Sequence, residues 1–402
     1  PQDIEIIDQI KKTQFANILS KPKESLIEII SDDLDKAFIK TSVKLGKLKL
    51  KSRANFKIIF TSLHGTSITA VPEVLEQAGY KNVHVVASQA KPDGNFPTVK
   101  SPNPEEPEAL ELALQEAKKI DADIVIGTDP DCDRLGVAVK NKNNEFSLLN
   151  GNQTMAVMTY FLLENWKKNK RLDGNQFIAT TIVSTPMIEK IASAYSVKYM
   201  ETLTGFKWIG KLIKDYPNLE FIGGGEESFG YLIGDKIRDK DAVTATLLAC
   251  EIGSYAKETG KSFYEILEDC YRKFGAYKEK LLSFTLKGKE GAEKIKVMME
   301  VFRKNPPKKL GGKKIVQIED YLKGNRFTIP FNDIEKITLP KANVLIFKLE
   351  DDSRIAIRPS GTEPKIKFYF SVNAKMDINE SWQELEKKLD KRIEAIIQTL
   401  NL

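Results

Sequence analysis

The 402-residue sequence has few cysteines and no long apolar run. Its three cysteines, Cys132, Cys250 and Cys270, form no CxxC pair and no disulfide framework, so we expect a reducing, cytoplasmic environment. No apolar run approaches the ~18 residues of a membrane span, and the mean hydropathy is −0.32. With 41% hydrophobic and 29% charged residues, the composition excludes a disordered, collagen-like, coiled-coil or membrane protein.

The charge balance is only mildly basic. There are 62 Lys and Arg against 56 Asp and Glu, a net charge of +6, which favours anionic ligands. The basic residues are spread along the chain and the pI is 8.8, below the ~9 typical of a dedicated nucleic-acid binder. At ~100–200 residues per domain, this length predicts roughly two to four domains.

Apolar, strand-like segments alternate with helical ones in two successive stretches. The first runs from an apolar segment at 56–60 to another at 122–126, and the second begins near Arg171. Such alternation predicts α/β domains, and the two stretches have the form of distant copies of one unit. From about Tyr277, strand-like segments come ahead of one terminal helix, 381–400, which predicts a smaller α+β domain.

Two kinds of segment carry weaker local patterns. Residues 1–50 are charged and expected to be helical, because apolar residues recur there at helical spacing, at Ile27, Ile30, Leu34 and Phe38. The Lys-rich stretches 167–171 and 308–314 are expected to be solvated linkers.

The segment from Thr128 to Arg134, TDPDCDR, carries the sharpest chemical signal. Its three carboxylates alternate directly after an apolar strand, which places them at the carboxyl end of a sheet, where α/β proteins bind ligands. Hard oxygen ligands crowded so closely need a cation, and Mg²⁺ is the usual choice in phosphate chemistry. An EF-hand is excluded, because it needs Gly and Glu where Arg134 and Lys140 stand.

A glycine-rich acidic turn, GGGEESFG from Gly223 to Gly230, follows another apolar strand. It has neither the glycine spacing of a dinucleotide fingerprint nor the lysine of a P-loop. The carboxylate of Glu226 and the hydroxyl of Ser228 suit hydrogen bonding to sugar hydroxyls. A plain glycine turn with exposed acids is the alternative.

A basic, hydroxyl-rich loop, RPSGTE from Arg358 to Glu363, lies between two strand-like segments. Arg358 supplies a planar fork for phosphate. Ser360, Gly361 and Thr362 supply hydroxyls and approachable backbone N–H groups. The combination predicts a phosphate-binding loop.

The segment Thr204-Gly-Phe-Lys-Trp208 precedes a predicted helix. Lys207 suits a phosphate contact or a proton carrier. A lysine flanked by aromatic residues also commonly lies along apolar surface, and the spacing leaves both interpretations open.

In this order, the motifs resemble those of the α-D-phosphohexomutase family, which includes phosphoglucomutases and phosphomannomutases. The acidic loop is similar to the family's magnesium loop, the glycine-rich turn to its sugar-specificity loop, and the Arg358 loop to its phosphate-binding loop. The Lys207 segment is similar to one that carries an active-site lysine. The resemblance covers about residue 50 to Phe370 and implies a fold of four domains around one cleft, with the second, third and fourth present here.

The resemblance also implies roles for single residues. The implied Mg²⁺ ligands are Asp129, Asp131 and Asp133. The implied catalytic residues are Lys207, as an acid/base or phosphate contact, and Arg134, which orients the phosphoryl group. The implied substrate-binding residues are Glu226 and Ser228 for sugar hydroxyls and Arg358, Ser360, Gly361 and Thr362 for the phosphate that does not react. The implied reaction interconverts sugar 1-phosphates and 6-phosphates, with glucose 1,6-bisphosphate as activator and intermediate.

One family motif has no counterpart. Family members carry the transferable phosphate on a serine of the first domain, in a Ser-His-Asn-Pro type loop. Neither of the two histidines, His64 and His84, follows a serine, and Ser101-Pro-Asn-Pro104 lacks the histidine. Because the sequence also starts at Pro1, we expect a chain that lacks the first domain and shows no mutase turnover by itself.

The expected fold class is therefore two mixed-sheet α/β domains of the phosphohexomutase type plus a smaller C-terminal α+β domain. Residues 1–20 are expected to be a remnant of the first domain. The expected domains are 21–165 with the metal loop, 166–285 with the sugar loop, and 286–402 with the phosphate loop.

The substrate and the reaction class stay open at this level. The Glu-Glu-Ser-Phe-Gly run resembles glucose-preferring members, whereas the segment around Lys207 and the run Arg238–Asp241 resemble the phosphopentose branch; mannose is also open. The rival classes are a phosphatase with an aspartate nucleophile and a non-catalytic phosphosugar-binding protein. The expected partner is a phosphosugar, with neither nucleic acid nor membrane.

Overall fold

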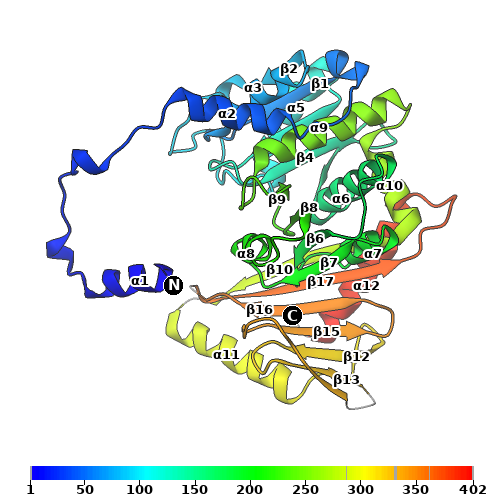
Figure 1. Ribbon diagram of the computed structural model, residues 1–402. Coiled ribbons are helices and arrows are strands. Elements are labelled where there is room, and N and C mark those ends of the chain that lie inside the picture. The colour runs from blue at the N-terminus through cyan, green and yellow to red at the C-terminus, as the bar shows by residue number, and fades with distance from the viewer. Residues whose placement is uncertain (1, 287, 330–332, 362, 401–402) are drawn as a thin grey trace. The chain divides into compact units, whose positions relative to one another are not determined.

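The computed structural model describes residues 2–286, 288–329, 333–361 and 363–400, and most of them lie in helices or β-strands (Figure 1). The chain divides into two compact units, residues 1–41 and 42–402. Among the residues that the structure describes, no helix combines the length and the apolar character that crossing a bilayer requires.

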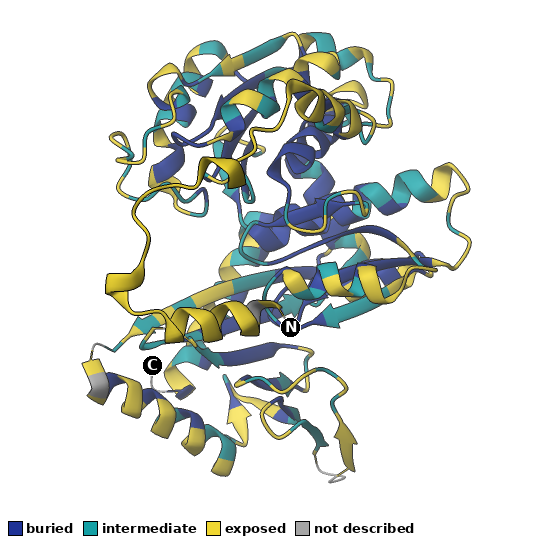
Figure 2. Cartoon of the chain, turned by 60° about the vertical axis from the view of Figure 1, so that its left-hand side comes forward, coloured by how far each residue is buried: buried dark blue, intermediate teal, exposed yellow. Residues whose placement is uncertain are grey.

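The first unit is mostly exposed (Figure 2). It contains α1 (Gln2–Lys12), two 3₁₀ turns (Phe15–Asn17 and Glu24–Leu26) and most of α2 (Asp32–Val43). The prediction of helix throughout residues 1–50 is wrong for the stretch that contains Ile27 and Ile30. Apolar spacing alone does not nucleate a helix. Instead α2 begins where acidic side chains favour a helix N-terminus, at Asp32, Asp33 and Asp35.

A mixed sheet, here called the β1 sheet, opens the second unit. Its strand order is β2-β1-β3-β4-β5, with β1 parallel to β2 and β3 and the remaining pairs antiparallel. Helices α3, α5 and α9 pack on its strands. The bounds are η3 (Lys51–Asn55), β1 (Lys57–Thr61), α3 (Ser67–Gln77), β2 (Asn82–Val85), α4 (Ala87–Ala90), η4 (Pro107–Leu110), α5 (Glu111–Ile120), β3 (Ile124–Thr128), β4 (Leu135–Lys140), β5 (Phe146–Leu149) and α9 (Ala242–Glu258).

The next sheet, the β6 sheet, repeats this topology. Its order is β7-β6-β8-β9, again with two parallel pairs around the first strand and an antiparallel last strand. The shared order agrees with the expectation of two copies of one unit, and both loops with acidic motifs follow the third strand of their unit. The bounds are α6 (Gly151–Lys168), β6 (Gln176–Thr181), α7 (Met187–Ala194), β7 (Lys198–Thr202), α8 (Lys207–Asp215), β8 (Glu220–Gly225), β9 (Tyr231–Ile233) and α10 (Phe263–Phe274).

The C-terminal sheet, the β16 sheet, is antiparallel in every pairing of its described strands, in the order β10-β17-β16-β15-β12-β13-β14. Both α11 and α12 contact β17. The bounds are β10 (Ala276–Thr285), α11 (Gly288–Lys304), β11 (Lys309–Leu310), β12 (Lys313–Asp320), β13 (Asn325–Thr328), β14 (Asp333–Lys336), β15 (Leu345–Leu349), β16 (Arg354–Pro359), β17 (Lys365–Ala374) and α12 (Trp382–Leu400).

Two expectations for this region are wrong. The terminal helix is present as α12, but α11 is a second helix that the expectation of one helix omitted. The Lys-rich stretch 308–314 is a hairpin, β11 to β12, and not a linker. Gly311 and Gly312 turn the chain there with φ of 54° and 79°, a conformation that glycine adopts at little cost.

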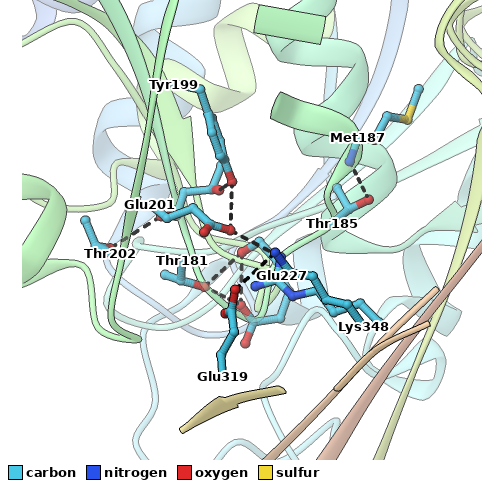
Figure 3. A network of polar contacts seen from close by, with 12 residues as sticks. Thr181, Thr185, Met187, Tyr199, Glu201, Thr202, Glu227, Glu319 and Lys348 are labelled. Carbon is cyan, nitrogen blue, oxygen red and sulfur yellow. Dashed lines mark hydrogen bonds and ion pairs between the residues drawn. The ribbon is translucent and has the colours of Figure 1, made fainter. Parts of the chain in front are cut away.

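The β6 and β16 sheets meet through an apolar cluster. Figure 3 shows a polar network that includes Glu201 from the β6 sheet and Glu319 and Lys348 from the β16 sheet. The cluster joins Val183 and Leu203 to Ile346 and Tyr369. In the network, Glu201 on β7 accepts a hydrogen bond of 3.2 Å from Nη1 of Arg354 on β16. Glu319 on β12 accepts hydrogen bonds from Arg326 Nε at 2.9 Å and Tyr321 at 3.0 Å, and Lys348 Nζ lies 3.0 Å from its carboxylate. The Arg354–Glu201 pair thus connects the two sheets.

Candidate functional site

The acidic loop connects β3 to β4, as its sequence position predicted. One oxygen from each of Asp129, Asp131 and Asp133 lies within 4.8 Å of the others, so the three carboxylates can face one cation. Asp129 shapes the loop: its Oδ1 accepts the backbone N–H groups of Asp133 (2.9 Å) and Arg134 (2.8 Å). Its other oxygen, Oδ2, lies 3.5 Å from Nε of Arg134.

The turn after β1 contacts the acidic loop through the backbone. The backbone N–H of Thr66 donates to the carbonyl of Pro130 at 2.8 Å. A Cβ on Gly65 would lie 2.3 Å from Pro130 Cα, so only glycine allows this approach. This backbone contact between the two turns therefore helps to position the acidic loop.

Burial and like charge act together on Asp129. Burial raises the pKa of this carboxyl to about 7, and the charges of Asp133 and Asp131 add to the rise, while the N–H donors of Arg134 and Asp133 oppose it. A bound divalent cation would lower the pKa of Asp129 again, because it stabilises the ionised carboxylate.

Two basic side chains complete the surroundings of the loop. Arg134 places Nη1 3.1 Å from Glu105 Oε1 and Nε 3.5 Å from Asp129 Oδ2. Lys240 places Nζ 2.9 Å from Asp133 Oδ2. The sequence analysis did not single out Lys240 for this position.

The glycine-rich turn between β8 and β9 lies against the acidic loop. Arg134 and Gly230 form an antiparallel β-bridge, and the N–H of Leu135 donates to the carbonyl of Phe229 at 2.9 Å. Glu226 Oε1 accepts the N–H of Gly205 at 2.8 Å, which ties the Lys207 segment to the same place. The backbone therefore brings together three motifs that lie far apart in the sequence.

A pocket of about 520 Å³ opens at this junction. Of the predicted residues, it is lined by Arg134, Glu226, Ser228 and Arg358. The three aspartates are not among its lining residues, but Arg134, which lines it, lies 3.5 Å from Asp129 and 3.8 Å from Asp133. The site thus joins loops of all three sheets.

Other predicted residues lie elsewhere. Ser360 and Gly361 line a second pocket, of about 820 Å³, beside α11, and Thr362 lies outside the described residues. Lys207 is exposed at the start of α8, with Nζ 5.6 Å from the centre of the Trp208 ring. Lys207 is not among the residues that line the 520 Å³ pocket, and its role stays a prediction.

The pocket floor is one face of the β16 sheet, and the sequence analysis missed most of it. Cross-strand pairs set this face: Arg358 with Lys367, Ala356 with Tyr369, and Arg354 with Ser371. Only strand register reveals these pairs, although the alternation Lys365-Ile-Lys367 was a usable signal. Asn103, Glu105, Glu227 and Glu279 also line the pocket.

All three of these carboxyls have raised pKa values. Burial raises the pKa of Glu227 to about 7, and the charge of Glu226 adds to this, although Thr181 and Ser184 donate hydrogen bonds to it. Burial likewise raises the pKa of Glu279 to about 7. Shifted carboxyls in a concave site are typical of functional pockets.

Family models match three successive parts of the chain. They are described as phosphoglucomutase/phosphomannomutase alpha/beta/alpha domain II (residues 36–143), alpha/beta/alpha domain III (150–274) and the C-terminal domain (303–387). A phosphoglucomutase of Staphylococcus haemolyticus is 35% identical over 379 residues, 90% of this chain and 67% of the relative. The chain belongs to the phosphoglucomutase/phosphomannomutase family. The recognition from motifs and the fold class are thereby confirmed.

Other relatives agree. The phosphoglucomutase of Staphylococcus aureus USA300 is 39% identical over 323 residues, 80% of this chain and 57% of the relative. The open form of parafusin, a phosphoglucomutase from Paramecium, has a TM-score of 0.62 at 20% identity, over 91% of this chain and 62% of that one. A family protein from Burkholderia thailandensis has a TM-score of 0.58 at 16% identity, over 92% and 65%. The chain thus spans 57–67% of the length of these relatives.

Proposed function

We propose that this chain binds sugar phosphates in the 520 Å³ pocket and contributes the metal-, sugar- and phosphate-binding parts of a phosphoglucomutase. The observation that carries the proposal is the meeting of Arg134, Glu226 and Arg358 in one pocket. In the proposed reaction, a phosphosugar exchanges its phosphoryl group between two hydroxyls through a bisphosphate. Turnover is proposed for a complete family member, and its absence in this chain alone stays a prediction.

The chemistry of the pocket walls suits the two ends of such a ligand. Arg358 and Lys367, paired across β16 and β17, offer positive charge to a phosphate. Glu226 and Ser228 stand on the glycine-rich turn, where a carboxylate and a hydroxyl accept and donate hydrogen bonds to sugar hydroxyls. Glucose is the preferred sugar, because relatives at 35–39% identity are named phosphoglucomutase; mannose and pentose are the alternatives.

The aspartate cluster fits Mg²⁺. Its donors are carboxylate oxygens, the hard ligands that this ion prefers. Burial and the neighbouring carboxylates raise the pKa of Asp129, and a bound cation would favour its ionised form. When bound, the ion would neutralise charge on the transferred phosphoryl group. A phosphatase with Asp129 as nucleophile is less favoured, because Oδ1 of Asp129 already accepts two backbone N–H groups.

Lys240 is better placed than Lys207 for a proton or phosphate role. Its ammonium lies at the acidic loop, 2.9 Å from Asp133, whereas Lys207 is exposed. Neither lysine lines the 520 Å³ pocket, so the proposal for Lys240 rests on its contact with the acidic loop, and Lys207 is the second candidate.

Replacing Arg358 tests the proposed phosphate site. We expect Arg358→Ala to weaken binding of glucose 1,6-bisphosphate, measured by calorimetry with Mg²⁺, by about 10- to 100-fold, the effect of losing charge-assisted hydrogen bonds. Lys365→Ala is the matched control: it removes one charge from the same hairpin, but Lys365 pairs with Glu363 and does not line this pocket. Equal binding by the native chain and Arg358→Ala would refute the phosphate role.

Metal binding is expected to depend on pH through Asp129. A cation needs the ionised carboxylate, so a group with a pKa of about 7 must release its proton on binding below that pH. We expect Mn²⁺ affinity to be constant above about pH 8 and to fall by up to tenfold per pH unit well below 7. Calorimetry in buffers of different ionisation enthalpy measures the released proton; no release at pH 6 would contradict the assignment.

A further inference from the structure

The proline-rich loop at 101–106 forms part of the pocket wall. It lacks the histidine of the family's serine loop. In the structure Pro104 is buried against β4: a Cβ on Gly136 would lie 2.9 Å from both Cβ and the carbonyl oxygen of Pro104. This close packing holds the next residue, Glu105, at the pocket beside Arg134.

Glu105 engages a cation that a phosphate would otherwise meet. Its Oε1 lies 3.1 Å from Nη1 of Arg134. The Nε of the same guanidinium faces Asp129 Oδ2 at 3.5 Å and Asp133 Oδ1 at 3.8 Å. Carboxylates of the protein therefore surround Arg134 and neutralise its charge.

Glu105 also interacts electrostatically with a basic residue of strand β17, Lys367. Burial raises the pKa of this carboxyl, and the positive charges of Arg134 and Lys367 act against the rise. Lys367 on β17 pairs with Arg358, and the two offer the positive charge proposed for a phosphate. The Glu105 carboxylate therefore interacts with two cations, Arg134 and Lys367, that line the pocket proposed for a phosphate.

We propose that Glu105 is the internal counter-anion of Arg134, and that a phosphate group must displace it to bind in the pocket. The inference rests on the proposed function, since it assigns a phosphate to this pocket. Carboxylate and phosphate oxygens accept the same guanidinium N–H groups, so the two compete for one cation. Glu105 would in this way favour phosphosugars over small anions. A phosphosugar gains hydroxyl contacts that offset the cost of displacing Glu105, whereas a small anion with few other contacts does not.

The sign of the effect follows from charge. A carboxylate a few ångströms from a phosphate dianion repels it, and even at the dielectric of water this costs about tenfold in affinity. Neutralising Glu105 also frees Arg134. Had Glu105 merely held Arg134 in a productive position, its removal would weaken binding instead.

The test uses the full chain and two ligands, orthophosphate and α-glucose 1-phosphate, in calorimetric titrations. We expect Glu105→Gln to bind orthophosphate about tenfold more tightly than the native chain. The control is Glu106→Gln, whose side chain is exposed and accepts a hydrogen bond from Ser101 away from the pocket; it is expected to stay within twofold of native. Unchanged or weaker orthophosphate binding by Glu105→Gln overturns the proposal.

An Arg134→Met background separates displacement from general repulsion. If Glu105 acts by occupying Arg134, the gain from Glu105→Gln shrinks to about twofold there. A gain that stays tenfold overturns the counter-anion role.

The two ligands separate this inference from the proposed function. Tighter orthophosphate binding without any binding of glucose 1-phosphate supports the counter-anion and contradicts the sugar-phosphate function. Glucose 1-phosphate binding that ignores Glu105→Gln contradicts the inference alone, and failure of every variant to bind either anion contradicts both.

Discussion

Replacing Asp129 by asparagine is expected to weaken divalent-cation binding by more than 100-fold while making the metal-free chain more stable. The amide oxygen of an asparagine can still accept the two N–H groups that Oδ1 of Asp129 accepts, so the loop keeps its shape. The other position becomes an NH₂ group, which donates and cannot bind a cation. The variant therefore removes a ligand and little else.

The gain in stability follows from the pKa. In the folded chain the pKa of Asp129 is raised from 3.8 to about 7, so ionising it disfavours the folded state at every pH above the unfolded value. At pH 8 this amounts to at most about 4 kcal/mol, which neutral asparagine relieves. We expect a higher melting temperature for Asp129→Asn without metal, and no further rise on adding Mg²⁺ or Mn²⁺, whereas the native chain gains stability from either ion.

The control is Asp121→Asn, which removes an exposed carboxylate at the end of α5, away from the acidic loop. It is expected to leave cation affinity unchanged. Mn²⁺ titration followed by calorimetry and by thermal unfolding measures both effects. A native-like metal affinity in Asp129→Asn would remove the cluster as the cation site.

The motif loops were predictable because each depends on a short, contiguous pattern. Asp129, Asp131 and Asp133 come directly after an apolar strand, and the turn that brings them together needs only the residues between β3 and β4. The same holds for the glycine-rich turn after β8. Local patterns of this kind place a loop on a fold without knowledge of what packs beside it.

The pocket walls were not predictable, because they depend on which strands lie side by side. Lys367 reaches the site through its pairing with Arg358, and Glu279 through the pairing of β10 with β17, across some 90 residues of sequence. Glu105 reaches it through the packing of Pro104 on Gly136. Lys207 is a different case: its flanking motif is at the site, tied by Gly205 to Glu226, but its side chain is exposed, and its role stays a prediction.

Replacing Arg354 by methionine is expected to destabilise the chain by about 2–4 kcal/mol, because it breaks a charged pair between the β6 and β16 sheets. The Arg354 side chain is only 8% exposed, and its Nη1 donates to Glu201. Removing one partner of a buried pair leaves the other charge uncompensated, which is strongly destabilising. Glu201 would keep only the hydroxyl of Tyr199, at 3.3 Å, among the partners found in the described residues.

Two buried nitrogens of Arg354 moderate the loss. Nε and Nη2 have no hydrogen-bond partner in the described structure, and each unsatisfied donor costs about 1–3 kcal/mol. Methionine removes that cost together with the charge. We therefore expect the double variant Arg354→Met/Glu201→Met to recover most of the stability, because neither charge then stays buried alone.

Arg326→Met separates this pair from the rest of the network. Arg326 is 34% exposed, and its partner Glu319 keeps Lys348 and Tyr321, so we expect a loss below about 1 kcal/mol. Urea unfolding of the three variants gives the comparison. If Arg354→Met has the same urea midpoint as the native chain, the prediction is wrong. The apolar cluster around Val183 and Ile346 would then hold the two sheets together without help from the charged pair. If the predicted order holds, the strand that carries Arg358 is fixed against the β6 sheet at Arg354, which lines the same pocket.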